Sequence, residues 1–163
     1  TDRYERTFTP EGGDAMQNLV KDVKISRVMN AVAAGTTTQT AAAPVDMSGW
    51  DGVTFIALFG TITDGAPGLK ARQDAVVGMG GAADLAGTLT SAAITDDNRA
   101  IVLDVYRPLE RYVDCQVLRG GATGAVIDGV IAIQYRGRKS PVTQDTAHVA
   151  ANKSLISPSE GTA

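Results

Sequence analysis

The chemistry open to this chain is limited by its single cysteine and single histidine, Cys115 and His148. One thiol cannot form a disulfide within the chain. One cysteine and one histidine also cannot reproduce the ligand spacings of the Cys and His metal sites. Ser-His-Asp catalysis needs an imidazole in a rigid setting, whereas His148 lies in a polar C-terminal segment. Cys115 lies mid-strand, where it alternates with Asp114 and Gln116 and stands beside Val113 and Val117, and we interpret it as a small core residue. These residues therefore predict no metal site and no nucleophilic enzyme.

A glycine-rich segment, Gly78-Met79-Gly80-Gly81-Ala82-Ala83, fits the G-x-G-x-x-A form of a dinucleotide-binding loop. Such a loop must lead directly into a helix whose N-terminus meets the pyrophosphate. Here Gly87 and Thr88-Leu89-Thr90 follow instead, and this composition favours a strand. We interpret the segment as a loop between strands and expect no cofactor there.

Two adjacent carboxylates, Asp96 and Asp97, are the remaining candidate for acid–base chemistry. A glycoside hydrolase needs two carboxyl groups that face each other across a cleft at a set separation. Neighbouring residues within Thr95-Asp96-Asp97-Asn98 are instead typical of a tight turn that faces solvent. A divalent-ion site at this turn is the weaker alternative.

The elements that position these residues are predicted to be strands. The clearest strand spans residues 53–59 and is apolar on both faces, which indicates a central, buried position. Short connections leave no room for crossover helices, so we expect the successive strands to pair antiparallel. About eight strands in all predict an all-β, antiparallel β-sandwich or jelly-roll-like single domain. The other clear strands span 100–107, 111–119 and 125–136, and weaker candidates span 23–34, 37–43, 68–74 and 85–93.

Both ends of the chain are poor in large apolar residues, so neither can offset the entropy of its own ordering by burial. We expect residues 1–23 to be an N-terminal arm with a short helix at 14–21, where Asp14 would cap the first turn. Residues 24–139 are the predicted β-sandwich domain, and residues 140–163 an extended C-terminal arm. Removal of residues 140–163 is expected to spare the fold.

Composition and charge exclude further classes of protein. The 163 residues carry a formal net charge of −3, and scattered arginines are balanced by 18 acidic residues, which argues against direct contact with nucleic acid. No run of about 18 apolar residues is present, so we expect no membrane span. Alanine supplies 24 of the hydrophobic residues, and the predicted core is correspondingly thin.

Basic residues gather at the ends of the later strands. Scattered arginines balanced by acids fit the polar rim of a protein–protein interface better than a nucleic-acid surface. Within the strands, Asp104 and Asp114 are predicted to make structural pairs with Arg107 or Arg111. The five candidate interface residues are Arg107, Arg111, Arg136, Arg138 and Lys139.

Three segments resemble a known family. They are Val45-Asp46-Met47-Ser48-Gly49-Trp50-Asp51-Gly52-Val53, Leu103-Asp104-Val105-Tyr106-Arg107-Pro108-Leu109-Glu110-Arg111-Tyr112-Val113, and Ala125-Val126-Ile127-Asp128-Gly129-Val130-Ile131-Ala132-Ile133-Gln134-Tyr135 with its basic exit. They are similar to small structural proteins encoded in tailed-bacteriophage morphogenesis clusters, of the capsid decoration or cement type. The resemblance covers roughly residues 45–145 and part of the tail at 157–161.

The resemblance implies a virion protein of the capsid exterior, made in the host cytoplasm, with no catalytic residues and no cofactor. Its implied partners are the major capsid protein, whose subunits it would bridge, and further copies of itself in a dimer or trimer. The alternative within the virion is a head–tail neck or tail component. A carbohydrate-binding or adhesin module is a third hypothesis, although Trp50 is the only tryptophan. An enzyme is the fourth.

Overall fold

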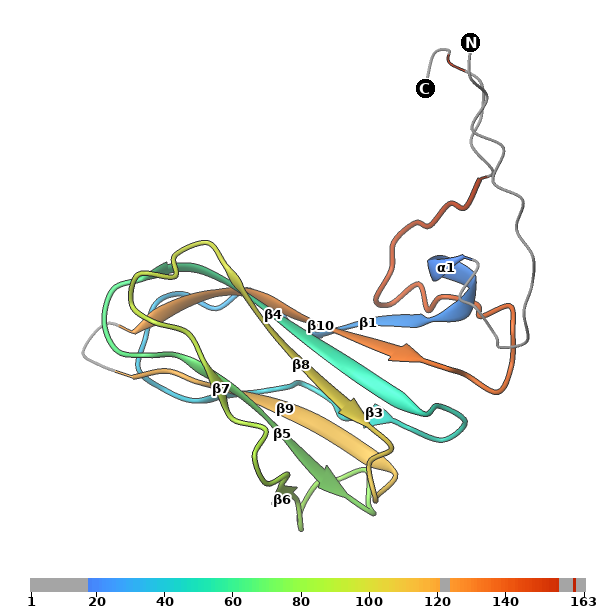
Figure 1. Cartoon of the computed structure of the whole chain (residues 1–163), viewed down its shortest axis with the longest axis horizontal. Coiled ribbons are helices and arrows are strands. Elements are labelled where there is room, and N and C mark those ends of the chain that lie inside the picture. The colour runs from blue at the N-terminus through green and yellow to red at the C-terminus, as the bar shows by residue number, and fades with distance from the viewer. Residues whose placement is uncertain (1–17, 121–123, 156–159, 161–163) are drawn as a thin grey trace, which may run out of the picture.

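The computed structural model describes residues 18–120, 124–155 and 160, and these residues form an all-β fold with a single helical turn. The elements lie in two groups that face each other (Figure 1). Their bounds are α1 (Leu19–Asp22), β1 (Lys24–Met29), β2 (Gln39–Thr40), β3 (Val45–Asp46), β4 (Gly52–Ile62), β5 (Gly68–Asp74), β6 (Ala83–Asp84), β7 (Thr90–Ser91), β8 (Ala100–Tyr106), β9 (Tyr112–Leu118) and β10 (Ala125–Tyr135).

The strands form two antiparallel sheets. The first sheet has the order β1-β10-β4-β8. The second has the order β2-β9-β5-β6, and β3 and β7 pair beside it with β9 and β5. Every strand pair runs antiparallel, as the short connections predict.

Consecutive strands, however, do not pair as their order in the chain suggests. β8, β9 and β10 follow one another directly, yet β8 and β10 both pair with β4, whereas β9 pairs with β5 in the other sheet. The sheet spacing of about 10 Å is within the span of a short loop, so loop length alone does not keep two strands in one sheet. The prediction that β8, β9 and β10 pair with one another in sequence was therefore wrong.

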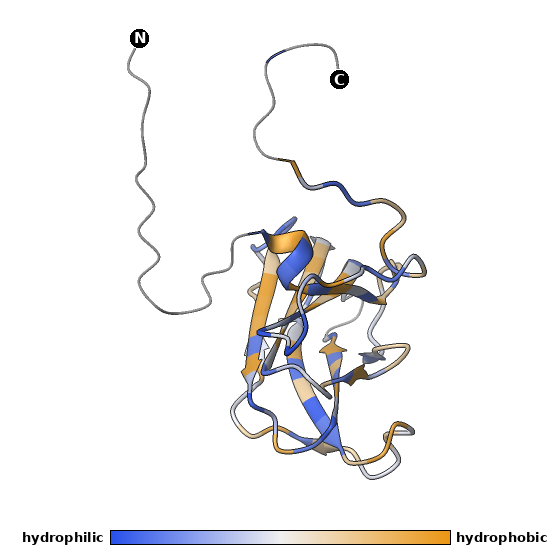
Figure 2. Ribbon diagram, turned by 90° about the vertical axis from the view of Figure 1, so that its right-hand side faces the viewer, coloured by the Kyte–Doolittle hydropathy of each residue, from blue (hydrophilic) through white to orange (hydrophobic). Residues whose placement is uncertain are grey.

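The core lies between the two sheets because each long strand buries one row of side chains there. β8 is the simplest case, since exposed and buried residues alternate strictly along its seven residues. Phe55 from β4, Leu69 from β5 and Ile127 from β10 are fully buried. Cys115 on β9 is also fully buried, which confirms its prediction as a core residue. Figure 2 shows the hydrophobic residues running mainly along the strands.

The weaker strand predictions were correct in part. Residues 68–74 form β5 with the predicted bounds. In the predicted strand 85–93, only Thr90–Ser91 is a strand, because a turn with Gly87 at φ 79° interrupts the segment. The predicted strand 37–43 is reduced to Gln39–Thr40.

The segment that follows β10 returns to lie beside α1 and β1 (Figure 1). The described part of the predicted helix 14–21 is a single turn, Leu19–Asp22, and residues 14–17 lie outside the described residues. Val142 donates a backbone hydrogen bond to the carbonyl of Lys21 at 2.6 Å. The buried side chain of Gln144 accepts a bond from the amide of Ile25 at 3.0 Å. Residues 142–144 thus pack along the first strand.

A candidate interface at the basic end of the sheets

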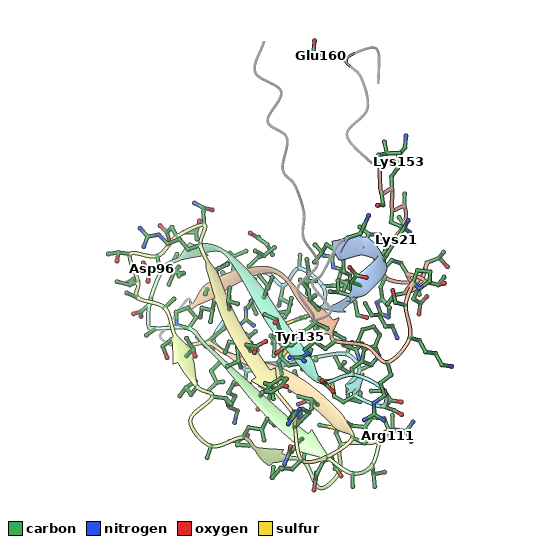
Figure 3. All side chains as sticks on the ribbon, turned by 45° about the vertical axis from the view of Figure 1, so that its right-hand side comes forward. Lys21, Asp96, Arg111, Tyr135, Lys153 and Glu160 are labelled. Carbon is green, nitrogen blue, oxygen red and sulfur yellow. The ribbon has the colours of Figure 1, made fainter. Side chains whose placement is uncertain are left out.

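The five predicted interface residues lie at one end of the sheets, which we call the basic end. Arg107 and Arg111 bound the loop between β8 and β9, and the other three follow β10. Pairing of Gly52 with both Tyr106 and Tyr135 places the two strand ends on either side of β4. Figure 3 shows Arg111 at this end and Asp96 at the opposite end. The basic end comprises Arg107, Arg111, Arg136, Arg138 and Lys139.

A shallow hollow of about 570 Å³ lies at the basic end. Its walls are the segment 47–51, which leads into β4, and the loop 107–111. Arg138 completes the lining, so three of the five predicted residues meet at one depression. Arg136 is not part of the lining, although its Nε atom lies 3.7 Å from an oxygen of Asp51 in the wall, and Lys139 is exposed.

Arg111 is held in place by Asp46. Its Nε and Nη2 atoms donate to the two carboxylate oxygens of Asp46 at 2.9 and 2.8 Å, a bidentate geometry. The hydrogen bond from Arg111 lowers the pKa of Asp46 below its usual 3.8, and the bond from the amide of Ser48 adds to this effect. The amide of Met47 donates to the carbonyl of Arg111 at 2.8 Å. Arg111 therefore fixes the segment before β4 against the loop before β9.

Arg107 and Arg138 keep their positive charge available. Neither has a carboxylate within ion-pair distance in the described part of the chain. The amide of Arg107 donates to the carbonyl of Asp51 at 2.7 Å, and its guanidinium lies 5.1 Å from the centre of the Tyr106 ring. The amide of Arg138 donates to the carbonyl of Gly49 at 2.9 Å. The backbone of both residues is fixed while their side chains face solvent.

Leu109 projects from the tip of the same loop and is 91% exposed. Its amide donates to the side-chain oxygen of Gln73 at 3.1 Å, which braces the loop against the end of β5. A single exposed leucine is common on protein surfaces, and what distinguishes Leu109 is its position between Arg107 and Arg111 on a braced loop. The arrangement presents one apolar side chain beside Arg107, Glu110 and Arg111, and arginine is a residue enriched in protein interfaces.

Sequence reasoning found the arginines but missed Leu109 and both residues that brace the loop, Asp46 and Gln73. The available signal was the run Arg107-Pro108-Leu109-Glu110-Arg111, in which a leucine stands at the apex of a charged loop between two strands. The supporting residues come from elements 36 and 65 positions away, and no local pattern marks them.

The predicted partners of the two strand aspartates were wrong. Asp114 pairs with Arg72 on the neighbouring strand β5. Asp104 accepts bonds from the hydroxyls of Thr54 at 2.6 Å and Tyr135 at 2.8 Å. Cross-strand neighbours are closer than residues a few positions along the chain in a strand, and this decides both pairings.

The other candidate residues make structural contacts. Asp97 accepts a bond from the amide of Ile62 at 2.6 Å, and Asp96 binds Arg99 at 2.6 Å, so both stabilise the predicted turn. The carboxylate of Asp74 accepts bonds from the amides of Val76 and Gly81 and organises the glycine-rich loop between β5 and β6. Among the described residues, no group of three Cys, His, Asp or Glu side chains is placed to hold a metal ion.

Comparison of the chain with family models, curated proteins and solved structures finds no match. Within the described residues, no helix is long and apolar enough to cross a membrane.

Proposed function

We propose that this chain is a structural protein of a tailed-bacteriophage particle that binds the outer surface of the capsid and bridges major capsid protein subunits. The proposal starts from the sequence resemblance, which covers the strands and loops that build the basic end. The structural observation that carries it is the braced loop of Leu109 between Arg107 and Arg111. This loop offers a preorganised contact for an acidic protein surface with a small apolar recess.

The finer fold that we propose is a jelly-roll sandwich. Counted with β2 and β3 as one interrupted strand, and β6 and β7 as another, the described residues form eight strands in sequence order. The first, eighth, third and sixth strands then form one sheet, and the second, seventh, fourth and fifth the other. This order supports a jelly roll, an architecture used by many viral capsid domains.

The test is binding of the purified chain to capsids of the phage that encodes it, assembled without this protein. We expect the double substitution Arg107→Glu and Arg138→Glu, and separately Leu109→Ser, to weaken binding by at least about ten-fold. Arg27→Glu is the matched control, because Arg27 is an exposed arginine on β1 that has no ion pair among the described residues and does not line the hollow. Increasing salt should weaken binding of the wild-type chain.

Equal binding by the wild type and both basic-end variants would overturn the role of this surface. Binding of the wild-type chain at the neck or tail, with none on the shell, would replace the proposed capsid role by the alternative virion position. A labelled chain imaged on intact particles distinguishes the two locations.

A further inference from the structure

The first sheet has two edges, and the described residues cover one of them. At β1, the amide of Ile25 donates to Gln144, and the carbonyl of Arg27 lies 3.1 Å from Nδ1 of His148. The pairing of β1 also shifts register between Arg27 and Met29, which interrupts that edge. At the opposite edge, β8 pairs with β4 alone within the described residues.

The exposed edge of β8 is regular. All seven residues pair with β4 without a register shift, and the strand contains no proline or lysine. Bulges, prolines and charged side chains are the features that usually prevent edge strands from pairing with other chains. β8 has no bulge and no proline, and Asp104 is its one charged residue, so its edge is a template for a further strand.

The hydrogen bonds that flank β8 show which backbone groups face outward. Phe59 donates to the carbonyl of Arg99 at 3.0 Å, and Arg107 donates to the carbonyl of Asp51 at 2.7 Å. Because bonding alternates along an antiparallel ladder, the odd-numbered residues of β8 bond to β4. The N–H and C=O groups of the even-numbered residues, from Ala100 to Tyr106, therefore point to the exposed edge.

The outer face of the first sheet carries an aliphatic row that stops at this edge. Cross-strand pairing places Ile131 of β10 opposite Ile56 of β4, and Ile56 opposite Val102 of β8. We call these three residues the aliphatic row. Val102 is 57% exposed at its end. The row is partly buried on β10 and β4 and ends in an exposed valine at the edge.

A second copy of the chain fits this edge best. We propose that β8 pairs antiparallel with β8 of a second copy about a two-fold axis at Val102, so that two four-stranded sheets become one of eight strands. In this register Val102 faces its own symmetry mate, and the aliphatic row continues into the row of the second copy. Self-complementary two-fold contacts of this kind are the commonest route to homodimers.

Charge disfavours the register centred on Asp104. Pairing centred on Asp104 would place two carboxylates directly opposite each other, which is unfavourable. Pairing centred on Val102 instead places Asp104 opposite the small Ala100 and separates the two carboxylates by about 13 Å along the strands. A hollow of about 300 Å³ lined by residues 90–92 of the β7 segment and by 100–102 leaves room beneath the first half of β8 for side chains of the added strand.

The proposal is tested by sedimentation equilibrium of the full chain over a range of concentrations. We expect a dimer for the wild type. Val102→Lys should weaken association by at least about ten-fold, because two ammonium groups would meet at the axis. Val76→Lys is the matched control, since Val76 is 62% exposed in a loop outside β8, and it should remain dimeric.

Two further variants keep the test independent of folding defects. Val102→Pro removes an N–H that points away from β4, so circular dichroism should remain that of the wild type while the dimer is lost. Val102→Cys should form an intermolecular disulfide on oxidation, because residues in a hydrogen-bonded pair lie about 5.5 Å apart between Cα atoms. Ala100→Cys should not, and the buried Cys115 does not compete.

A monomeric wild type at the highest soluble concentration would overturn the proposal. A dimer that persists in Val102→Lys and Val102→Pro, or equal cross-linking at positions 100 and 102, would also overturn it. This dimer forms without capsids, so its failure and that of the proposed capsid function are distinguishable.

Discussion

Gln144 donates a hydrogen bond from its Nε2 atom to the carbonyl oxygen of Val23 at 2.7 Å, across 121 positions of the chain. The same nitrogen donates to the carbonyl of Val20 at 2.8 Å, and the Oε1 atom accepts from the amide of Ile25. One buried side chain thereby satisfies three backbone groups of the α1–β1 segment. The polar C-terminal segment supplies this anchor, although its composition predicts only an extended arm.

We predict that Gln144→Ala lowers the free energy of unfolding by about 1–3 kcal/mol, because it leaves buried backbone groups without partners. Urea denaturation measures the change. Gln116→Ala is the control, since Gln116 makes a single bond to Thr40 at an exposed site, and it should have a small effect. A chain that ends at Lys139 should be destabilised as well, which revises the expectation that this truncation spares the fold. Equal stability of the full and truncated chains would contradict the prediction.

A second prediction concerns the Arg72–Asp114 pair. The Nε and Nη2 atoms of Arg72 both donate to the carboxylate of Asp114, which is 2% exposed. Asp114→Ala should cost about 3 kcal/mol in the free energy of unfolding, because Arg72 loses its partner in a largely buried setting. The pair of Lys70 on β5 and Asp84 on β6 is the control, because its carboxylate side chain is 57% exposed, and Asp84→Ala should cost less than about 1 kcal/mol.

A double substitution tests whether Arg72 and Asp114 stabilise the fold as a coupled pair. Replacing Arg72 by Met and Asp114 by Leu together should recover most of the lost stability, because no unpaired charge then remains. A double variant as unstable as the sum of its single variants would show that the pair is not coupled.

A third prediction concerns Gly52, which lies between two tyrosines on the outer face of the first sheet. The rings of Tyr106 and Tyr135 stack with centroids 6.5 Å apart, and a Cβ atom at Gly52 would overlap the Tyr135 ring. The hydroxyl of Tyr135 is fixed by its bond to Asp104, so the ring cannot move away without losing that bond. Gly52→Ala should therefore cost about 1–3 kcal/mol.

Thermal denaturation checks this prediction against Gly78→Ala, where an added Cβ meets nothing within 4 Å. The control should be neutral or slightly stabilising, because alanine restricts the unfolded chain. Combining Gly52→Ala with Tyr135→Ala should cost less than the sum of the two single changes, and simple additivity would count against a steric cause.

A fourth prediction is alkaline destabilisation caused by Cys115. Burial raises the pKa of this thiol from 9.0 to about 12. The folded state binds the thiol proton more tightly than the unfolded state does. The contribution of the protonated thiol to the free energy of unfolding is therefore full below pH 9 and is lost as the pH rises from about 9 towards 12. Between pH 8 and 10, the free energy of unfolding measured by denaturation should fall as the pH rises. The fall should be smaller in Cys115→Ala.

The choice of pH range separates this effect from that of Tyr135. Burial and the bond to Asp104 raise the pKa of Tyr135 to about 12 from 10.0, so its contribution begins to decline only above pH 10. A thiol reagent should label Cys115 only in denaturant. Rapid labelling of the native chain would show that the thiol is accessible.

The sequence is sufficient to predict the long strands and the all-β class, because alternation and two-sided burial are local properties. The strand predicted at 53–59 lies within β4, and that at 125–136 nearly coincides with β10. Choice of partner is not local. Whether β9 joins β8 or β5 depends on which sheet buries Val113, Cys115 and Val117, and nothing in the adjacent loops encodes this.

The candidate interface was likewise predictable only where the signal is local in the sequence. Charged residues at strand ends mark an exposed loop, so Arg107 and Arg111 are evident from the sequence. The bidentate partner of Arg111 is Asp46, which reaches it because β3 pairs with the beginning of β9. Pairing of distant strands thus decides which arginine side chains form an ion pair within the chain and which can contact a partner.

The position of β10 between β1 and β4 has a consequence during synthesis. The ribosome releases β1 and β4 long before the strand that joins them, so the first sheet cannot close until residue 135 has emerged. Until then both strands expose unpaired edges and apolar faces, a state prone to aggregation in slow-folding topologies. Nascent chains stalled before residue 125 should therefore depend on chaperones, whereas completed chains should not.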